Sequence, residues 1–197
     1  MTDTLSFYAD NTADFINRTS ELNLSALYSE FLPLIPRSGS ILDAGCGSGR
    51  DSRYFINQGY TVHAIDAVPE IAKQASEHIG QPVEVATFEN FRSDDEFNGI
   101  WACASLLHVP PDSLPAAIGN LASYLRSGGI FYMSFKYGHG QRTHGTRQFT
   151  DMNESGLEAL ASRTPSLTLK KTWTTEDLRP DRNTEKWMNA IWTSRTE

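Results

Sequence analysis

The stretch that most constrains this chain is Ile-Leu-Asp-Ala-Gly-Cys-Gly-Ser-Gly-Arg at residues 41–50. Two apolar residues lead into Asp43, and three glycines then occupy alternate positions. Glycine accepts positive φ angles and lets a ligand approach the backbone closely. We interpret the stretch as a buried strand that ends at Asp43, a tight turn, and a helix over 51–58 whose free N–H groups face a bound group. This order is typical of a nucleotide-cofactor loop on an α/β sheet, although a tight turn that binds nothing has the same local pattern.

The glycine spacing and a second acid narrow the choice of cofactor. Dinucleotide-binding loops carry G-x-G-x-x-G, whereas this chain has G-x-G-x-G after a strand-end acid. The next apolar run, 60–65, ends at Asp66. An acid that closes a second strand is placed to accept hydrogen bonds from both hydroxyls of an adenosine ribose.

The order Leu-Asp-x-Gly-x-Gly-x-Gly, strand, Asp over residues 41–66 resembles the class I S-adenosylmethionine (SAM)-dependent methyltransferases. The resemblance implies an α/β fold, namely a Rossmann-like seven-stranded, mostly parallel sheet with an antiparallel last strand and helices on both faces. It also implies SAM as the cofactor and S-adenosylhomocysteine (SAH) as its product. Residues 134–138 and the short chain are similar to the tellurite-resistance-type and related small-molecule methyltransferases.

The resemblance implies cofactor contacts from loops at the ends of four strands. The glycines would lie against the methionine part, Asp43 would hold its ammonium group, and Asp66 would bind the ribose. The acid that many relatives place after the third strand is absent, which leaves Thr87, Phe88 or Glu89 to cover the adenine. The expected cofactor-binding residues are Asp43, Gly45, Cys46, Gly47, Gly49, Arg50, Asp66, Ala67, Val68, Thr87, Phe88, Glu89, Ala104, Ser105 and Leu106.

Two further segments resemble parts of these methyltransferases that lie near the transferred methyl group. Residues 104–110, Ala-Ser-Leu-Leu-His-Val-Pro, put His108 where a general base could act, but a histidine before Val-Pro also packs or caps a helix. Residues 7–15 resemble the lead-in Tyr-x-x-Asn-Ala-x-x-Phe, with the alanine displaced by one position. We expect residues 1–22 to form an N-terminal lid in which Tyr8 and Phe15 shield the methyl group or staple the first helix. His108 and Tyr8 are the candidates for catalysis.

Residues 136–150 are predicted to form a loop insertion that concentrates positive charge in an acidic chain. Glycines and basic side chains follow the fifth strand here, so we expect a mobile lid that recognises a negatively charged or strongly polar acceptor. A solvated loop with scattered charge is the alternative. The residues expected to bind the acceptor are Tyr8, Phe15, Lys136, Tyr137, His139, Arg142 and Arg147.

Hydrophobic periodicity predicts the remaining elements. Helices are expected over 24–34, 70–79, 114–125 and 152–162, and strands over 83–88, 99–104 and 130–135. Gly128 and Gly129 are expected to close the helix over 114–125. Two strand-like runs, 167–174 and 186–193, then follow with only a polar turn at 179–183 between them, which predicts an antiparallel pair.

Composition limits the classes of function. A net charge of −7 and a pI near 5.2 argue against a large nucleic-acid footprint, which needs clustered Lys and Arg. We expect a single domain over 1–197, no bound metal, no secretory signal, and no membrane span, since no apolar run reaches about 18 residues. Cys46 and Cys103 are predicted to be reduced thiols of a cytoplasmic protein.

These features predict an enzyme that transfers a methyl group from SAM to a small-molecule acceptor, because the chain has no large substrate domain. Methylation of RNA or protein is the alternative within the enzymes. A SAM-binding module without transfer activity is the alternative outside them. The acceptor and the oligomeric state are left open by the sequence.

Overall fold

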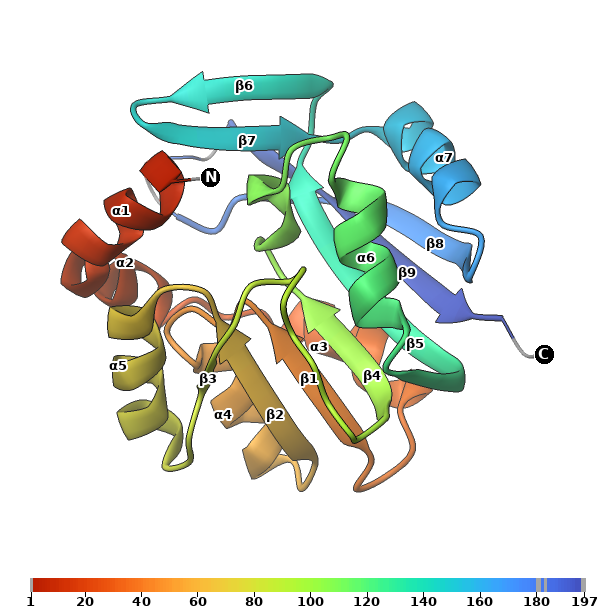
Figure 1. The fold of residues 1–197 in the computed structure, drawn as a ribbon, viewed down its shortest axis with the longest axis horizontal. Helices are drawn as coiled ribbons and strands as arrows, with labels where there is room; N and C mark the ends of the chain where they lie inside the picture. The colour runs from red at the N-terminus through yellow and green to blue at the C-terminus, as the bar shows by residue number, and fades with distance from the viewer. Residues whose placement is uncertain (1, 180–181, 183, 196–197) are drawn as a thin grey trace.

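The apolar runs of the chain form a seven-stranded sheet in the order β3-β2-β1-β4-β5-β9-β8. The computed structural model describes residues 2–179, 182 and 184–195 (Figure 1). The strands are β1 (Ser40–Ala44), β2 (Thr61–Asp66), β3 (Glu84–Val85), β4 (Phe97–Ala102), β5 (Leu125–Lys136), β8 (Leu167–Glu176) and β9 (Lys186–Ser194). The first five pair in parallel, whereas β9 runs antiparallel to both β5 and β8. The predicted fold class and terminal antiparallel pair are confirmed, and the predicted turn at 179–183 lies partly outside the described residues.

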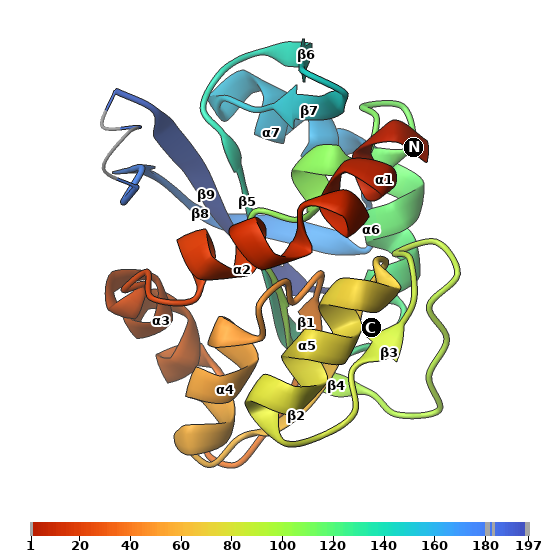
Figure 2. The same cartoon turned by 90° about the vertical axis from the view of Figure 1, so that its left-hand side faces the viewer.

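Helices cover both faces of the sheet, which is why its central strands are apolar on both sides (Figures 1 and 2). One face carries α3 (Ser25–Phe31), α4 (Arg50–Asn57) and α5 (Pro69–Ile79), and the other carries α6 (Leu114–Ala122) and α7 (Glu154–Arg163). Successive residues of β4 point to the two cores: Ile100 packs with α6 and α7, and Trp101 packs with α3, α4 and α5. None of the described helices combines the length and the apolar composition needed to cross a bilayer.

Two short helices and a hairpin lie beyond the carboxyl ends of the parallel strands. The helices are α1 (Thr2–Asp10) and α2 (Thr12–Thr19), and the hairpin is formed by β6 (Gly140–His144) and β7 (Arg147–Asp151). Figure 1 shows α1 beside the hairpin, above the rest of the sheet. The hydroxyl of Thr4 accepts the backbone N–H of Gln148 at 3.2 Å, so α1 is joined directly to β7.

The prediction of an irregular loop insertion at 136–150 is wrong, because residues 140–151 pair as an antiparallel hairpin. The glycines that suggested flexibility shape this hairpin instead. Gly140 and Gly145 have φ angles of +78° and +61°, and Gly145 lies in the tight turn between the two strands, where glycine is favoured. Whether the hairpin moves as a lid stays a prediction.

Two predicted boundaries are also wrong. Only Glu84 and Val85 of the third strand pair with β2, because the chain then turns over 87–90 instead of continuing along the sheet edge. The helix predicted to reach residue 125 ends at Ala122, and Gly128 and Gly129 lie inside β5. They occupy a bulge between the paired residues Leu125 and Ile130, where the register with β4 shifts.

Gly99 lies where the central strand β4 packs under α3, and it has no room for a side chain. An added Cβ would stand 2.7 Å from Cζ of the fully buried Phe31 and 2.6 Å from Cδ1 of Ile35. We expect Gly99→Ala to lower the free energy of unfolding by about 1–3 kcal/mol through overpacking. Gly119→Ala in α6, whose Cβ would meet no atom within 4 Å, should raise it by roughly 0.5–1 kcal/mol. Urea unfolding measures both, and a destabilised Gly119→Ala or an unaffected Gly99→Ala would contradict this packing.

Candidate functional site

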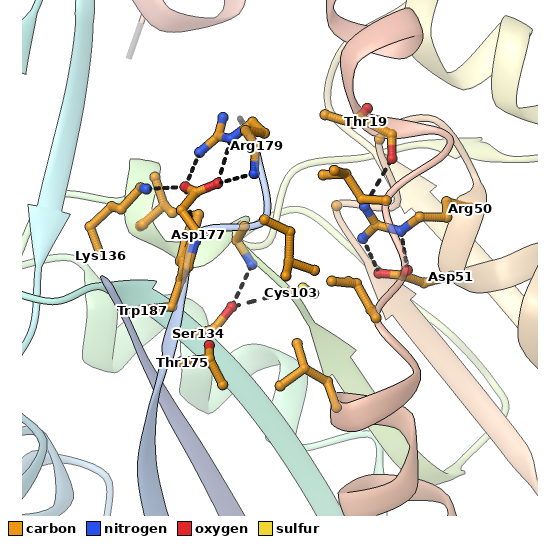
Figure 3. A pocket seen from close by; sticks show the side chains of 18 of the residues that line it. Thr19, Arg50, Asp51, Cys103, Ser134, Lys136, Thr175, Asp177, Arg179 and Trp187 are labelled. Carbon is orange, nitrogen blue, oxygen red and sulfur yellow. Dashed lines mark hydrogen bonds and ion pairs between the residues drawn. The ribbon is translucent and has the colours of Figure 1, made fainter. Parts of the chain in front are cut away.

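A cavity of about 250 Å³ opens at the carboxyl ends of β1, β4 and β5. β1 and β4 are neighbours although β2 and β3 lie between them in the chain, and open α/β sheets bind ligands at such a switch point. The glycine loop and α4 form one wall, and β5 with the ends of β8 and β9 forms the other (Figure 3). The predicted site residues that line this cavity are Tyr8, Phe15, Gly45, Cys46, Gly47, Arg50, Ala104, His108, Lys136 and Arg147.

At Gly45 and Gly47 the glycine loop faces this cavity with backbone atoms and no side chains. Gly45 and Gly47 have φ angles of +80° and +56°, where other residues are strained. A Cβ at Gly45 would stand 2.6 Å from Cβ of Ser105, so the segment after β4 packs directly against the loop. A Cβ at Gly47 would stand 3.2 Å from the ring of Phe15, which lies over the loop from α2.

Asp66 holds the glycine loop to the start of α5. Its carboxylate accepts the backbone N–H groups of Gly47 and Val68, both at 3.0 Å. Burial raises the pKa of Asp66, and these N–H groups act in the opposite direction. Asp66 does not line the cavity, so its contact with a ribose stays a prediction.

Asp43 lies behind the glycine loop and does not line the cavity either. Its carboxylate is buried and accepts the hydroxyl of Ser52 at 2.6 Å. Burial and the nearby charge of Asp51 raise the pKa of Asp43 well above its usual value. A positively charged ammonium group nearby would lower the pKa of Asp43 again. Contact between Asp43 and the methionine ammonium stays a prediction.

Asp51 lines the cavity at the start of α4, and our sequence analysis missed it. Its carboxylate accepts the Tyr28 hydroxyl at 2.6 Å, the Trp101 indole N–H at 2.8 Å and Arg50 Nε at 2.6 Å. Burial acts to raise the pKa of Asp51, but the Arg50 guanidinium outweighs it and holds this pKa below its usual value. Arg50 also donates to the carbonyl of Thr19 at 3.0 Å, which ties α2 to the glycine loop (Figure 3). The adjacent Arg-Asp pair after the third glycine is the signal that could have identified Asp51.

His108 and Tyr8 form a hydrogen-bonded pair at the edge of the cavity. His108 Nδ1 lies 2.9 Å from the carbonyl of Gln148, which can only accept, so Nδ1 carries the proton. His108 Nε2 then accepts the Tyr8 hydroxyl at 2.9 Å. Desolvation lowers the pKa of His108 to about 4, and the positive charge of Arg147 adds to this effect. The imidazole is therefore neutral at pH 7.

The wall opposite the glycine loop is organised around Asp177, which our sequence analysis also missed. Its buried carboxylate accepts Lys136 Nζ at 2.5 Å, Arg179 Nε at 2.9 Å and Trp187 Nε1 at 3.1 Å (Figure 3). Burial acts to raise the pKa of Asp177, but Arg179 and Lys136 hold it well below the usual range. Lys136 also pairs with Glu185. No local motif marks this cluster, because it forms only when β5, β8 and β9 come together.

Comparison with known proteins finds methyltransferases among the relatives of this chain. A family model described as a methyltransferase domain matches residues 41–129. Over 117 residues the chain is 37% identical to the malonyl-[acyl-carrier protein] O-methyltransferase of Pectobacterium atrosepticum, covering 58% of this chain and 44% of that protein. Over 109 residues it is 35% identical to the ubiquinone biosynthesis O-methyltransferase of Xylella fastidiosa, covering 51% of this chain and 43% of that protein. These matches support a class I SAM-dependent methyltransferase. The matches span less than half the length of these curated relatives.

Solved structures of methyltransferases share the fold. The 1,6-didemethyltoxoflavin-N1-methyltransferase of Burkholderia thailandensis has a TM-score of 0.75 and 23% identity, over 97% of this chain and 87% of that one. The N-methyltransferase NodS of Bradyrhizobium japonicum has a TM-score of 0.66 and 17% identity, over 87% of this chain and 96% of that one. At these identities the likeness concerns the fold alone.

The other predicted cofactor residues lie partly in a second cavity and partly in the protein interior. Ala67, Thr87 and Phe88 line a neighbouring cavity of about 60 Å³, which His108 also lines. Leu106 is fully buried in the core that packs against α6 and α7. The remaining predicted residues line neither cavity: Gly49, Val68, Glu89 and Ser105.

Only some of the predicted acceptor-binding residues of the hairpin region line the main cavity. Lys136 and Arg147 line the main cavity, whereas Tyr137, His139 and Arg142 do not. Tyr137 is exposed and donates its hydroxyl to Glu154 at 3.2 Å. Arg142 pairs with Asp151 of the neighbouring strand and lies 4.6 Å from the centre of the Phe149 ring.

The buried Asp43 should contribute a part of the stability of the protein that falls as pH rises. Its folded-state pKa is raised above the unfolded value of about 3.9. Between those two pKa values Asp43 is more protonated in the folded chain than in the unfolded chain, so its contribution to the free energy of unfolding declines with pH. Asp43→Asn removes this ionisation and keeps an acceptor for Ser52. We therefore expect the variant to gain stability over the wild type progressively from pH 4.5 to pH 8 in urea unfolding.

The matched control is Asp94→Asn, which changes an exposed carboxylate on the segment before β4. Its pH profile of stability should follow that of the wild type. Parallel profiles for wild type and Asp43→Asn would contradict a buried carboxylate that titrates in this way.

Proposed function

We propose that the protein transfers the methyl group of SAM to a small-molecule acceptor. The observation that carries the proposal is the shared cavity, in which the bare backbone of the glycine loop faces a wall of polar and aromatic side chains. Methyl transfer from a sulfonium is an in-line displacement, so it needs both reactants held together in a space that excludes water. A cavity with these two different walls suits that requirement.

The residues present fit SAM. When bound, SAM supplies a methyl group that is already activated on its sulfonium. Gly45 and Gly47 line the cavity, so the methionine part can approach the backbone of the loop there. We assign the adenine to the smaller cavity at Ala67 and Phe88, and the ribose to Asp66, which lies between the loop and α5.

We assign the acceptor to the opposite wall and propose that it is small and negatively charged. Arg147 lines the cavity with no carboxylate within 4.0 Å among the described residues, whereas Lys136 and Arg179 are paired with Asp177. The relatives are named for malonyl-[acyl-carrier protein], ubiquinone biosynthesis and 1,6-didemethyltoxoflavin, which supports a small or carrier-bound acceptor over a nucleic acid. The net charge of −7 also disfavours RNA.

We assign Tyr8 and His108 to closing the cavity rather than to proton transfer. His108 Nε2 is occupied by the Tyr8 hydroxyl, and its low pKa makes the imidazole a weak proton acceptor. The Tyr8 ring lies 5.1 Å from the Phe15 ring, and Phe15 covers the glycine loop. Together these side chains would exclude water from the reacting atoms.

The cofactor assignment is tested by direct binding. We expect Asp66→Ala to weaken SAM binding about tenfold or more, because each hydrogen bond to a charged acceptor contributes roughly 1.5–3 kcal/mol. Gly47→Val should abolish binding, because its side chain would enter the space beside Phe15. Isothermal titration calorimetry measures both, with Gly119→Ala as the control that should bind like the wild type. Wild-type protein that binds NADH and not SAM would refute the assignment.

The roles of Tyr8 and His108 are tested with an acceptor chosen from a panel of small molecules by SAH release. Tyr8→Phe keeps the ring and removes only the hydroxyl, so we expect kcat to fall less than about tenfold. A fall of about a hundredfold or more, with KM unchanged, would instead make the pair a proton-transfer device. SAM binding without SAH release for any acceptor would favour a binding module.

A further inference from the structure

Arg147 differs in its ion pairing from the other cations that line the main cavity. Among the residues that the structure describes, no carboxylate lies within 4.0 Å of its guanidinium. The other cations are all paired, as follows: Arg50 with Asp51, Lys136 with Asp177 and Glu185, Arg179 with Asp177, and Arg182 with Glu185. Arg147 therefore brings a positive charge to the cavity that the described part of the protein does not neutralise.

Aromatic rings hold this guanidinium in place. Its central carbon lies 4.3 Å from the centre of the Phe7 ring and 5.3 Å from that of Phe149. Ring faces attract the cation but offer no acceptor in the plane of its N–H groups. Nε of Arg147 is buried and makes no hydrogen bond, whereas the Tyr8 hydroxyl, which donates its proton to His108, also interacts with the guanidinium. The guanidinium is thus oriented, with donor capacity left over.

The charge balance of the cavity indicates how many negative charges an acceptor should carry. Among the residues that the structure describes, five cations and three carboxylates line it, and Glu185, paired with Lys136, offsets one more charge. One positive charge is left over among them, and Arg147 is the cation without a carboxylate within 4.0 Å. SAM would increase the excess, since its methionine end is zwitterionic and its sulfonium is a further cation. A monoanionic acceptor reduces this excess and is favoured by the local field.

We propose that the methyl acceptor carries a carboxylate on an apolar or aromatic body, and that Arg147 is the residue that binds this carboxylate. The proposal rests on the proposed function and names the acceptor class of the same cavity. A carboxylate is planar and monoanionic, and it matches the paired N–H groups of a guanidinium. Leu107, Phe149, Leu178 and Trp187 of the lining provide apolar surface for the body.

Calorimetry on the SAH-saturated protein tests the proposal with defined probes. Benzoate, phenylacetate and hexanoate are compared with their neutral amides. We expect at least one carboxylate to bind about tenfold or more tightly than its amide, the difference expected for a charge-assisted hydrogen bond. Arg147→Met should remove this preference, and Arg147→Lys, which keeps the charge but loses the planar fork, should retain part of it. SAH affinity should be unchanged in both variants.

Arg142→Met is the matched control, because Arg142 lies on the same hairpin and over the same Phe149 ring but outside the cavity lining. It should keep the full preference for carboxylates. The proposal is overturned if wild-type protein binds amides as well as carboxylates, binds none of the probes, or keeps its preference in Arg147→Met. Failure of SAH itself to bind in the first titration would instead refute the proposed function, so the two failures are distinguishable.

Discussion

The buried carboxylate of Asp51 is the interaction on which the arrangement of the cavity depends. A buried charge without partners costs several kcal/mol, so Asp51 requires its donors in place. Those donors come from different parts of the chain: Tyr28 from α3, Trp101 from β4, and the neighbouring Arg50. Because Arg50 also donates to Thr19 at the end of α2, the same carboxylate joins the N-terminal helices to the glycine loop. The loop, the sheet and the cover over the cavity are therefore held in one geometry.

The opposite wall uses the same physical device at Asp177. Lys136 from β5, Arg179 after β8 and Trp187 from β9 all donate to this buried carboxylate. Most of the charges around the cavity are thus neutralised within the protein, and their side chains are oriented before any ligand binds. Such preorganised groups act strongly in a space from which water is excluded. Arg147 has no carboxylate partner among the described residues, so the proposed recognition of the acceptor depends on its position more than on the number of basic residues nearby.

Much of the fold could be predicted because its signals are local. The apolar runs around Asp43 and Asp66 mark buried parallel strands, and two runs without an intervening helix marked the antiparallel pair β8 and β9. The glycines after β5 predict a mobile loop, whereas Gly140 and Gly145 belong to a hairpin in which they adopt positive φ angles. Glycines occur in flexible loops and in hairpins alike, so composition alone does not distinguish the two.

The sequence by itself determined the α/β architecture, the glycine loop and the class of cofactor, because backbone conformation at Gly45 and Gly47 and the periodicity of apolar residues are properties of neighbouring positions. Only the tertiary structure decided which basic side chains face the cavity. Lys136 meets Asp177 across 41 positions of the chain because β9 inserts between β5 and β8. Arg142 and Arg147 are five positions apart on one hairpin, yet only Arg147 lines the cavity. Strand register and packing decide which side chains pair with one another and which line the cavity. Neither is encoded in a local pattern of residues.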